Sequence, residues 1–144
     1  MKKYVGPIII VLVILGVVVK LHLGGGHTTE NPDKFCKKLL AKPGARELLP
    51  WLKEGKHSIG ESTSDEKSIE IANGLYSLGP ESVMAIEIDK YPGGLENTGK
   101  LVIKLPREKS KRQAILNWSA KIARAQGFDA YTDVGQDYVF VSLD

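Results

Sequence analysis

The chain has 144 residues, of which 26% are charged and 42% hydrophobic, a size that allows one ordinary domain and argues against a multidomain enzyme. The net charge of +3 would suggest an anionic partner if it were spread over the whole chain. The three excess positive charges belong to Lys2, Lys3 and Lys20. The remaining 17 Lys and Arg equal the 17 Asp and Glu in number, and both sets lie after residue 29. The main domain is therefore charge-balanced, and we expect no nucleic-acid partner.

Residues 4–23 are almost wholly apolar, and about 20 helical residues span the roughly 30 Å hydrocarbon core of a bilayer. β-branched side chains dominate the stretch, but in lipid only a helix bonds its own backbone. Pro7 stands in the first turn, where its missing N–H costs least. We expect a single transmembrane helix at 4–23 behind a basic flank at 1–3. A cleaved signal peptide is the competing interpretation, but no A-x-A-like site follows the stretch.

The charges around this stretch bear on its orientation. Lys2 and Lys3 directly precede it and favour a cytoplasmic N-terminus, while Lys20 and lysines farther along the chain oppose that assignment. We expect the following domain on the extracytoplasmic side, that is periplasmic or extracellular. Three consecutive glycines make residues 24–30 a flexible linker, so the α+β domain comprises residues 31–144.

Capping residues and helical periodicity predict four helices in this domain. The first helix begins at Asn31-Pro32-Asp33, and the second covers residues 45–53. The third helix follows a capping-box spacing at 63–66 and stops before Gly79-Pro80. The fourth helix follows a second capping box, Ser110 with Gln113, and ends at Gly127. In the first helix Cys36 lies on the apolar stripe, so we interpret it as a buried structural thiol.

Alternating apolar residues predict two strands, at 82–90 and 100–105, joined by the Pro- and Gly-rich segment 91–99 as an antiparallel hairpin with a long loop. Glu87 and Asp89 on the first strand are then expected opposite lysines of the second, on the solvent face. A last strand at 138–143 carries apolar residues on both faces.

A right-handed crossover through the last helix places strand 138–143 beside strand 82–90 and parallel to strand 100–105. The expected fold is α+β, with a three-stranded, mostly antiparallel sheet of order 2-1-3 and helices on one face. This topology resembles a ferredoxin-like split βαβ without its first strand, over roughly residues 65–144. The resemblance implies no function, because that architecture hosts many.

Residue types that carry chemistry are sparse. The three histidines have no zinc-ligand spacing with each other or with the single cysteine. Asp129, Asp133 and Asp137 are spaced by four, but alternating carboxylates and a terminal Glu, which a calcium loop requires, are missing. We expect no catalytic residue, no metal and no cofactor.

Five residues are candidate contacts with a partner or with lipid. Lys109, Lys111 and Arg112 form a basic run at a helix N-terminus, where cations oppose the macrodipole. Tyr91 and Asn97 lie in the connection between the first two strands, and such connections commonly carry recognition.

The sequence thus predicts a membrane-anchored, non-catalytic binding or assembly module with a protein partner of unknown identity, contacted through a sheet edge or through the 91–99 connection. Two alternatives stay open. One is a membrane-tethered enzyme with an unidentified site, and the other is a domain that docks on anionic lipid headgroups through the basic run.

Overall fold

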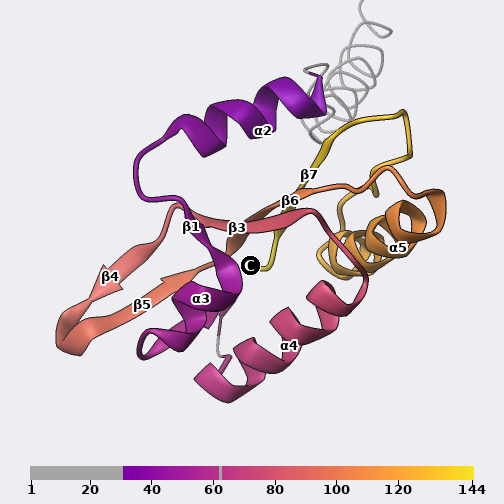
Figure 1. The fold of residues 1–144 in the computed structure, drawn as a ribbon. Coiled ribbons are helices and arrows are strands. Elements are labelled where there is room, and N and C mark those ends of the chain that lie inside the picture. The colour runs from indigo at the N-terminus through magenta and orange to yellow at the C-terminus, as the bar shows by residue number, and fades with distance from the viewer. Residues whose placement is uncertain (1–30, 62) are drawn as a thin grey trace, which may run out of the picture.

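The computed structural model describes residues 31–61 and 63–144 (Figure 1). The expected basic flank, transmembrane helix and linker, residues 1–30, lie outside the described residues. None of the helices in the described part has the length and apolarity needed to cross a membrane.

The described chain is an α+β domain, as expected, but with two sheets instead of one. Its helices are α2 (Pro32–Ala41), α3 (Leu48–Lys53), α4 (Asp65–Ser77) and α5 (Lys109–Ala125). The main sheet contains β1 (Arg46–Glu47), β3 (Ser82–Ile86), β6 (Lys100–Lys104) and β7 (Tyr138–Ser142). The smaller arm sheet contains β2 (His57–Ile59), β4 (Asp89–Tyr91) and β5 (Leu95–Thr98), with a 3-10 turn at Pro92–Gly94 between the last two.

Local capping chemistry explains where the helices begin and end. The Asn31 side chain accepts the Asp33 N–H at 2.9 Å, Ser64 accepts the Lys67 N–H at 3.2 Å, and Gly127 follows α5 at φ 79°. The predicted Ser110–Gln113 capping box is wrong, because Glu108 precedes α5 and Ser110 lies inside it. The second helix is shorter than predicted, since Arg46 and Glu47 pair with β3 instead.

The predicted strand order is wrong. The main sheet has the order β1-β3-β6-β7, and β7 pairs antiparallel with β6, not with β3. The reason is the connection at 126–137, which carries the chain back after α5. The Leu105 N–H donates to the Asp137 carbonyl at 2.7 Å, so β7 starts at the end of the sheet where β6 finishes. This return replaces the parallel crossover, and with it the three-stranded split βαβ.

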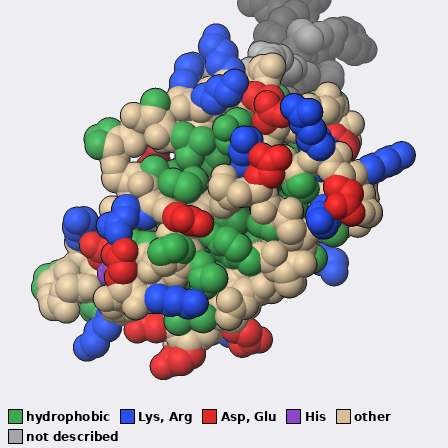
Figure 2. All heavy atoms as spheres, in the orientation of Figure 1, with side chains coloured by type: hydrophobic (Ala, Val, Ile, Leu, Met, Phe, Trp, Pro, Cys, Tyr) green, Lys and Arg blue, Asp and Glu red, His purple; other side chains and the backbone are tan. Residues whose placement is uncertain are grey.

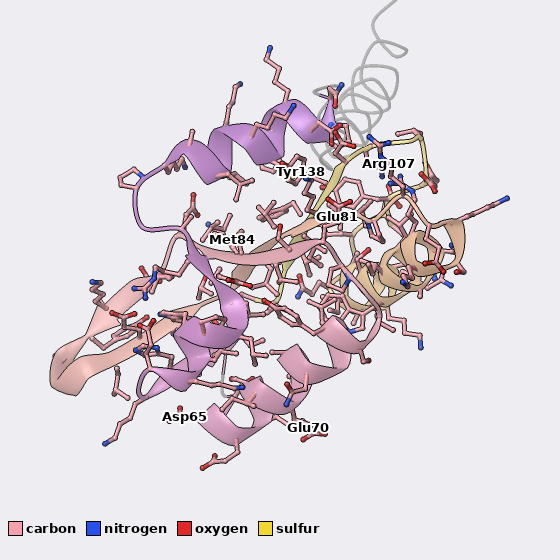
Figure 3. All side chains as sticks on the ribbon, in the orientation of Figure 1. Asp65, Glu70, Glu81, Met84, Arg107 and Tyr138 are labelled. Atoms are coloured by element: carbon pink, nitrogen blue, oxygen red, sulfur yellow. The ribbon has the colours of Figure 1, made fainter. Side chains whose placement is uncertain are left out.

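Helices cover both faces of the main sheet, not one (Figure 1). The larger core lies under α3, α4 and α5, and a smaller core lies under α2. Val102 alternates with Lys100 and Lys104 along its strand, but it is only 1% exposed and belongs to the smaller core. Met84 and Tyr138 pack against the same core beneath α2 (Figure 3).

The first and last described elements are joined directly. The Asp33 carboxylate of α2 accepts the Asp137 N–H at 2.9 and 3.1 Å and the Tyr138 N–H at 2.9 Å. The Phe35 ring meets the edge of Phe140 with centroids 5.5 Å apart and planes at 85°. α2 is therefore fixed on β7 by both polar and apolar contacts.

The predicted strand at 82–90 breaks at Glu87, whose φ of 48° no continuous strand adopts. β3 ends at Ile86, and residues from Asp89 onward turn into the arm sheet. The expected pairing of Glu87 with Lys100 is confirmed, and Lys42 also binds this carboxylate at 2.8 Å. The expectation for Asp89 is wrong, because Asp89 lies in β4 opposite Asn97 and Lys104 pairs with Glu81. These two ammonium groups lower the pKa of Glu87 to about 2.

Candidate functional site

Within the arm sheet, the outer strand β4 is exposed along its whole length, whereas β2 is mostly buried. β4 and β5 form a two-stranded arm that projects from the body of the domain (Figure 1). Their connection is the tight Pro92–Gly94 turn, where Gly93 and Gly94 both have positive φ, at 83° and 79°. The segment predicted as a long loop is thus an ordered hairpin, and β2 pairs with its inner strand, β5, in parallel.

One face of the arm is directed outward. The cross-strand pairs are Tyr91 with Leu95, Lys90 with Glu96, and Asp89 with Asn97. Because side chains alternate along a strand, Asp89, Tyr91, Leu95 and Asn97 share one face, which we call the arm face. Tyr91 is 52% and Leu95 46% exposed. The sequence-predicted contact residues Tyr91 and Asn97 therefore lie on the same surface.

The opposite face of the arm is held to the body by a polar cluster that we call the root cluster: Trp51, His57 and Glu96. The fully buried Trp51 donates its indole N–H to the Glu96 carboxylate at 2.7 Å. His57 stacks on Trp51, with centroids 4.9 Å apart and planes at 16°, and its Nδ1–H donates to the Trp51 carbonyl.

Glu96 completes the root cluster with two cationic or polar neighbours. Its carboxylate lies 3.7 Å from His57 Nε2 and 3.6 Å from Lys90 Nζ. The Trp51 hydrogen bond lowers the pKa of Glu96, assisted by His57 and Lys90. An ionised acceptor bonded to a buried donor fixes the arm rigidly on α3.

The free edge of β4 is short and poorly suited to strand addition. Glu96 and Thr98 bond β2, through Glu96 N–H to the Lys56 carbonyl at 3.2 Å and Gly60 N–H to the Thr98 carbonyl at 2.9 Å. The other two residues of β5, Leu95 and Asn97, therefore form their backbone hydrogen bonds with Tyr91 and Asp89 of β4. Within β4 this leaves the backbone N–H and C=O of Lys90 directed to the free edge. A lysine at the centre and the adjacent Pro92 are typical protections of an edge strand.

The edge of the main sheet at β7 is similarly protected. The pairing of Leu105 with Asp137 puts the backbone of Tyr138, Phe140 and Ser142 on the outer edge. Asp33 accepts the Tyr138 N–H, and the Gln126 side chain donates to the Ser142 carbonyl at 3.0 Å. Side-chain partners thus occupy part of the β7 edge, and the β4 edge is short, so the side chains of the arm face are the better contact surface.

The arm face combines an apolar pair with hydrogen-bond acceptors. Asn97 donates its amide N–H to Ser58 Oγ at 2.9 Å and to the Gly60 carbonyl at 3.0 Å, so its orientation is fixed. In the described residues no donor meets the Asn97 Oδ1 or the exposed Asp89 carboxylate. A polypeptide that offers an apolar side chain next to an N–H or cationic donor matches this chemistry.

The predicted basic run lies on α5, toward the opposite end of the molecule from the arm (Figure 1). Arg112 binds Asp133 at 2.7 Å and its side chain is only 12% exposed. This pair raises the pKa of Arg112 and lowers that of Asp133 to about 2. Lys111 pairs with Glu108 at 2.8 Å, which leaves Lys109 as the member of the run without an ion pair in the described chain.

A second surface, which sequence reasoning missed, lies between α5 and residues 128–133. This groove has a volume of about 590 Å³ and is lined by side chains such as Asn117, Arg124 and Thr132. Phe128 and Val134 beside it are 62% and 71% exposed. These residues follow no helical or strand period, so their exposure carries no sequence signal.

Other chemistry-bearing groups are buried or dispersed. Burial, assisted by the neighbouring Asp33 carboxylate, raises the pKa of the Cys36 thiol to about 12, so it stays protonated at neutral pH. Within residues 31–61 and 63–144, no three His, Cys, Asp or Glu side chains are grouped to hold a metal ion.

The fold and this surface define a small α+β domain that presents a rigid two-stranded arm. Comparison with protein-family models, with curated proteins and with solved structures finds no match. Function is therefore inferred from the geometry alone.

Proposed function

We propose that this chain is a membrane-anchored binding module that contacts a protein partner through the arm face and performs no catalysis itself. In this proposal residues 4–23 cross the membrane, residues 24–30 tether the domain, and the domain stands on the extracytoplasmic side. The observation that carries the binding role is the exposed Tyr91–Leu95 pair on a projecting, ordered arm.

Rigidity makes this pair a suitable contact. Leaving two large apolar side chains in water gains nothing for the isolated domain, whereas a partner that covers them gains about 25 cal/mol for each Å² removed from water. The root cluster orders the arm before the partner arrives, so little conformational entropy is lost on binding. Aromatic anchors of this kind dominate the energetics of many interfaces.

The partner contact is tested by photo-crosslinking in intact cells. A benzoylphenylalanine at position 91 keeps an aromatic ring at the tip of the arm and reacts with a partner within a few ångströms. We expect one defined adduct, and its loss when Leu95→Asp places a charge beside the probe.

Val134→Asp is the matched control, because Val134 is also apolar and exposed, at 71%, but lies outside the arm face. The adduct is expected to persist in this variant. An adduct that survives Leu95→Asp, or that Val134→Asp also removes, contradicts a contact through the arm face.

The anchor and its orientation are tested separately. Thr28→Cys in a Cys36→Ser background gives one cysteine in the linker, outside the buried core. A membrane-impermeant maleimide is expected to label it in intact cells. Labelling only after lysis refutes the extracytoplasmic assignment, and release of the chain from membranes by alkaline carbonate refutes the anchor itself.

A further inference from the structure

The outer side of α2 carries three exposed lysines, Lys34, Lys37 and Lys38, which we call the lysine face. Figure 2 shows basic side chains gathered over this helix. The opposite side of α2 is committed to the smaller core through Cys36 and Leu39, which are 1% and 9% exposed. The helix therefore cannot rotate, and the lysine face is directed away from the main sheet.

The positive charges of Lys34 and Lys37 on this face are not paired within residues 31–61 and 63–144. Asp33, the only acidic residue of α2, is occupied by two backbone N–H groups of the 137–138 segment. By contrast, Lys111 and Arg112 of the predicted basic run are both engaged in ion pairs.

The position of α2 in the chain adds an independent constraint. It is the first described element after the expected span at 4–23, and only residues 24–30 separate the two. A seven-residue segment reaches at most about 25 Å when fully extended. The lysine face is thus kept close to the membrane surface for as long as the anchor is in place.

From the charge and the tether together we infer that the lysine face of α2 docks on the anionic lipid headgroups of the membrane in which the chain is anchored. This inference rests on the anchor of the proposed function. Attraction to an anionic surface acts within a Debye length of about 8–10 Å, and the short linker keeps the start of α2 near enough to enter this range. Each lysine near such a surface favours the docked state by about fivefold, so Lys34 and Lys37 together favour it by about 25-fold.

Docking through α2 also orients the contact surface. α2 and the tip of the arm lie toward opposite ends of the molecule in Figure 1. With the lysine face on the headgroups, the arm is directed away from the bilayer and the arm face stays open to a partner. α4, on the far face of the main sheet, is then the helix most distant from the lipid (Figure 3).

The test uses the full chain in nanodiscs, with a fluorescent donor at Ala41→Cys in a Cys36→Ala background and an acceptor on the lipid headgroups. Ala41 lies at the edge of the lysine face and is exposed. We expect strong energy transfer in phosphatidylcholine mixed with phosphatidylglycerol, and weak transfer in phosphatidylcholine alone or at about 1 M salt, where the Debye length is about 3 Å. A donor at Glu70→Cys on α4 is expected to give weak transfer throughout.

A triple variant, Lys34→Glu with Lys37→Glu and Lys38→Glu, lowers the ratio of docked to free domain by at least about 25-fold and removes the transfer at position 41. The matched control reverses the same amount of charge elsewhere, at the exposed Lys53, Lys56 and Lys121. Transfer that is equal in both lipids, or that the control variant reduces as much, overturns the docking inference.

Failure of the anchor is distinguishable from failure of docking. A chain that does not stay in the nanodiscs refutes the anchor, and with it both proposals. A chain that stays in the nanodiscs but shows no dependence on anionic lipid refutes only the lysine face, and leaves the binding role of the arm face intact.

Discussion

Removing the Glu96 carboxylate is the sharpest test of how the arm is held. Trp51 is 0% exposed, and its indole N–H has Glu96 as its acceptor at 2.7 Å. In Glu96→Ala this donor stays buried without a partner, which costs about 1–3 kcal/mol. The second contact, with Lys90, contributes little because Lys90 is 79% exposed.

The expected loss in the free energy of unfolding for Glu96→Ala is thus about 2 kcal/mol. For a domain of this size that lowers the midpoint of thermal unfolding by about 8 °C. Glu96→Gln keeps an oxygen acceptor for the indole and is expected to lose about half as much. Lys90→Ala, which removes only the exposed ion pair, is expected to change stability by less than about 0.5 kcal/mol.

Circular dichroism followed through a urea titration measures all three variants against the unmodified chain. The order of loss is expected to be alanine, then glutamine, then the lysine variant. A Glu96→Ala loss below about 0.5 kcal/mol, or a glutamine variant as unstable as the alanine one, refutes the role assigned to the indole hydrogen bond.

Asp33→Ala removes the acceptor of the Tyr138 N–H and is expected to lower the free energy of unfolding in urea by about 1–2 kcal/mol, with Asp33→Asn losing less. The pKa of Glu87 is lowered to about 2 in the fold, so its contribution to the free energy of unfolding is present above about pH 4.5 and is lost as the pH falls toward 2. In Glu87→Gln the free energy of unfolding is expected to fall less steeply between pH 4.5 and 2, and an unchanged slope contradicts the assignment. Gly127→Ala is expected to cost about 1 kcal/mol because φ is 79°, whereas Gly74→Ala, inside α4 with open space around the added methyl, is expected to gain a similar amount in thermal unfolding.

Local features of the fold were predictable because their causes lie within a few residues. Asn31 and Gly127 mark helix ends through hydrogen bonds and backbone angles of their own neighbourhood. The pairing of β3 with β6 follows from two alternating runs close together in the chain. The α+β class follows from these elements alone.

The strand order was not predictable, because it depends on a segment without periodicity. No helical or strand period marks residues 126–137, yet they return along the sheet and reverse the direction of β7. The same reversal, together with α2, buries Val102 on a face that the alternation of lysines marked as solvent-exposed. The burial of a strand face by a helix that is distant in the sequence, such as α2, does not change the alternation of residues along that strand.

The candidate site was predictable in part. Tyr91 and Asn97 were predicted because they lie in the connection between two strands, and they share the arm face. The root cluster beneath them was not, because Trp51 and Glu96 are separated by 45 positions and neither belongs to a recognisable motif. Distant polar pairs of this kind need the fold before they can be assigned.

The contact between α2 and β7 has a consequence for the order of events during synthesis. Asp33 and Tyr138 are 105 positions apart, so α2 is made long before the strand that it covers. At translation rates of about 5–20 residues per second, its apolar side waits about 5–20 s for β7. During this interval Phe35 and Leu39 lack their native cover, so the apolar side of newly made α2 is exposed to water or to a chaperone until β7 is complete.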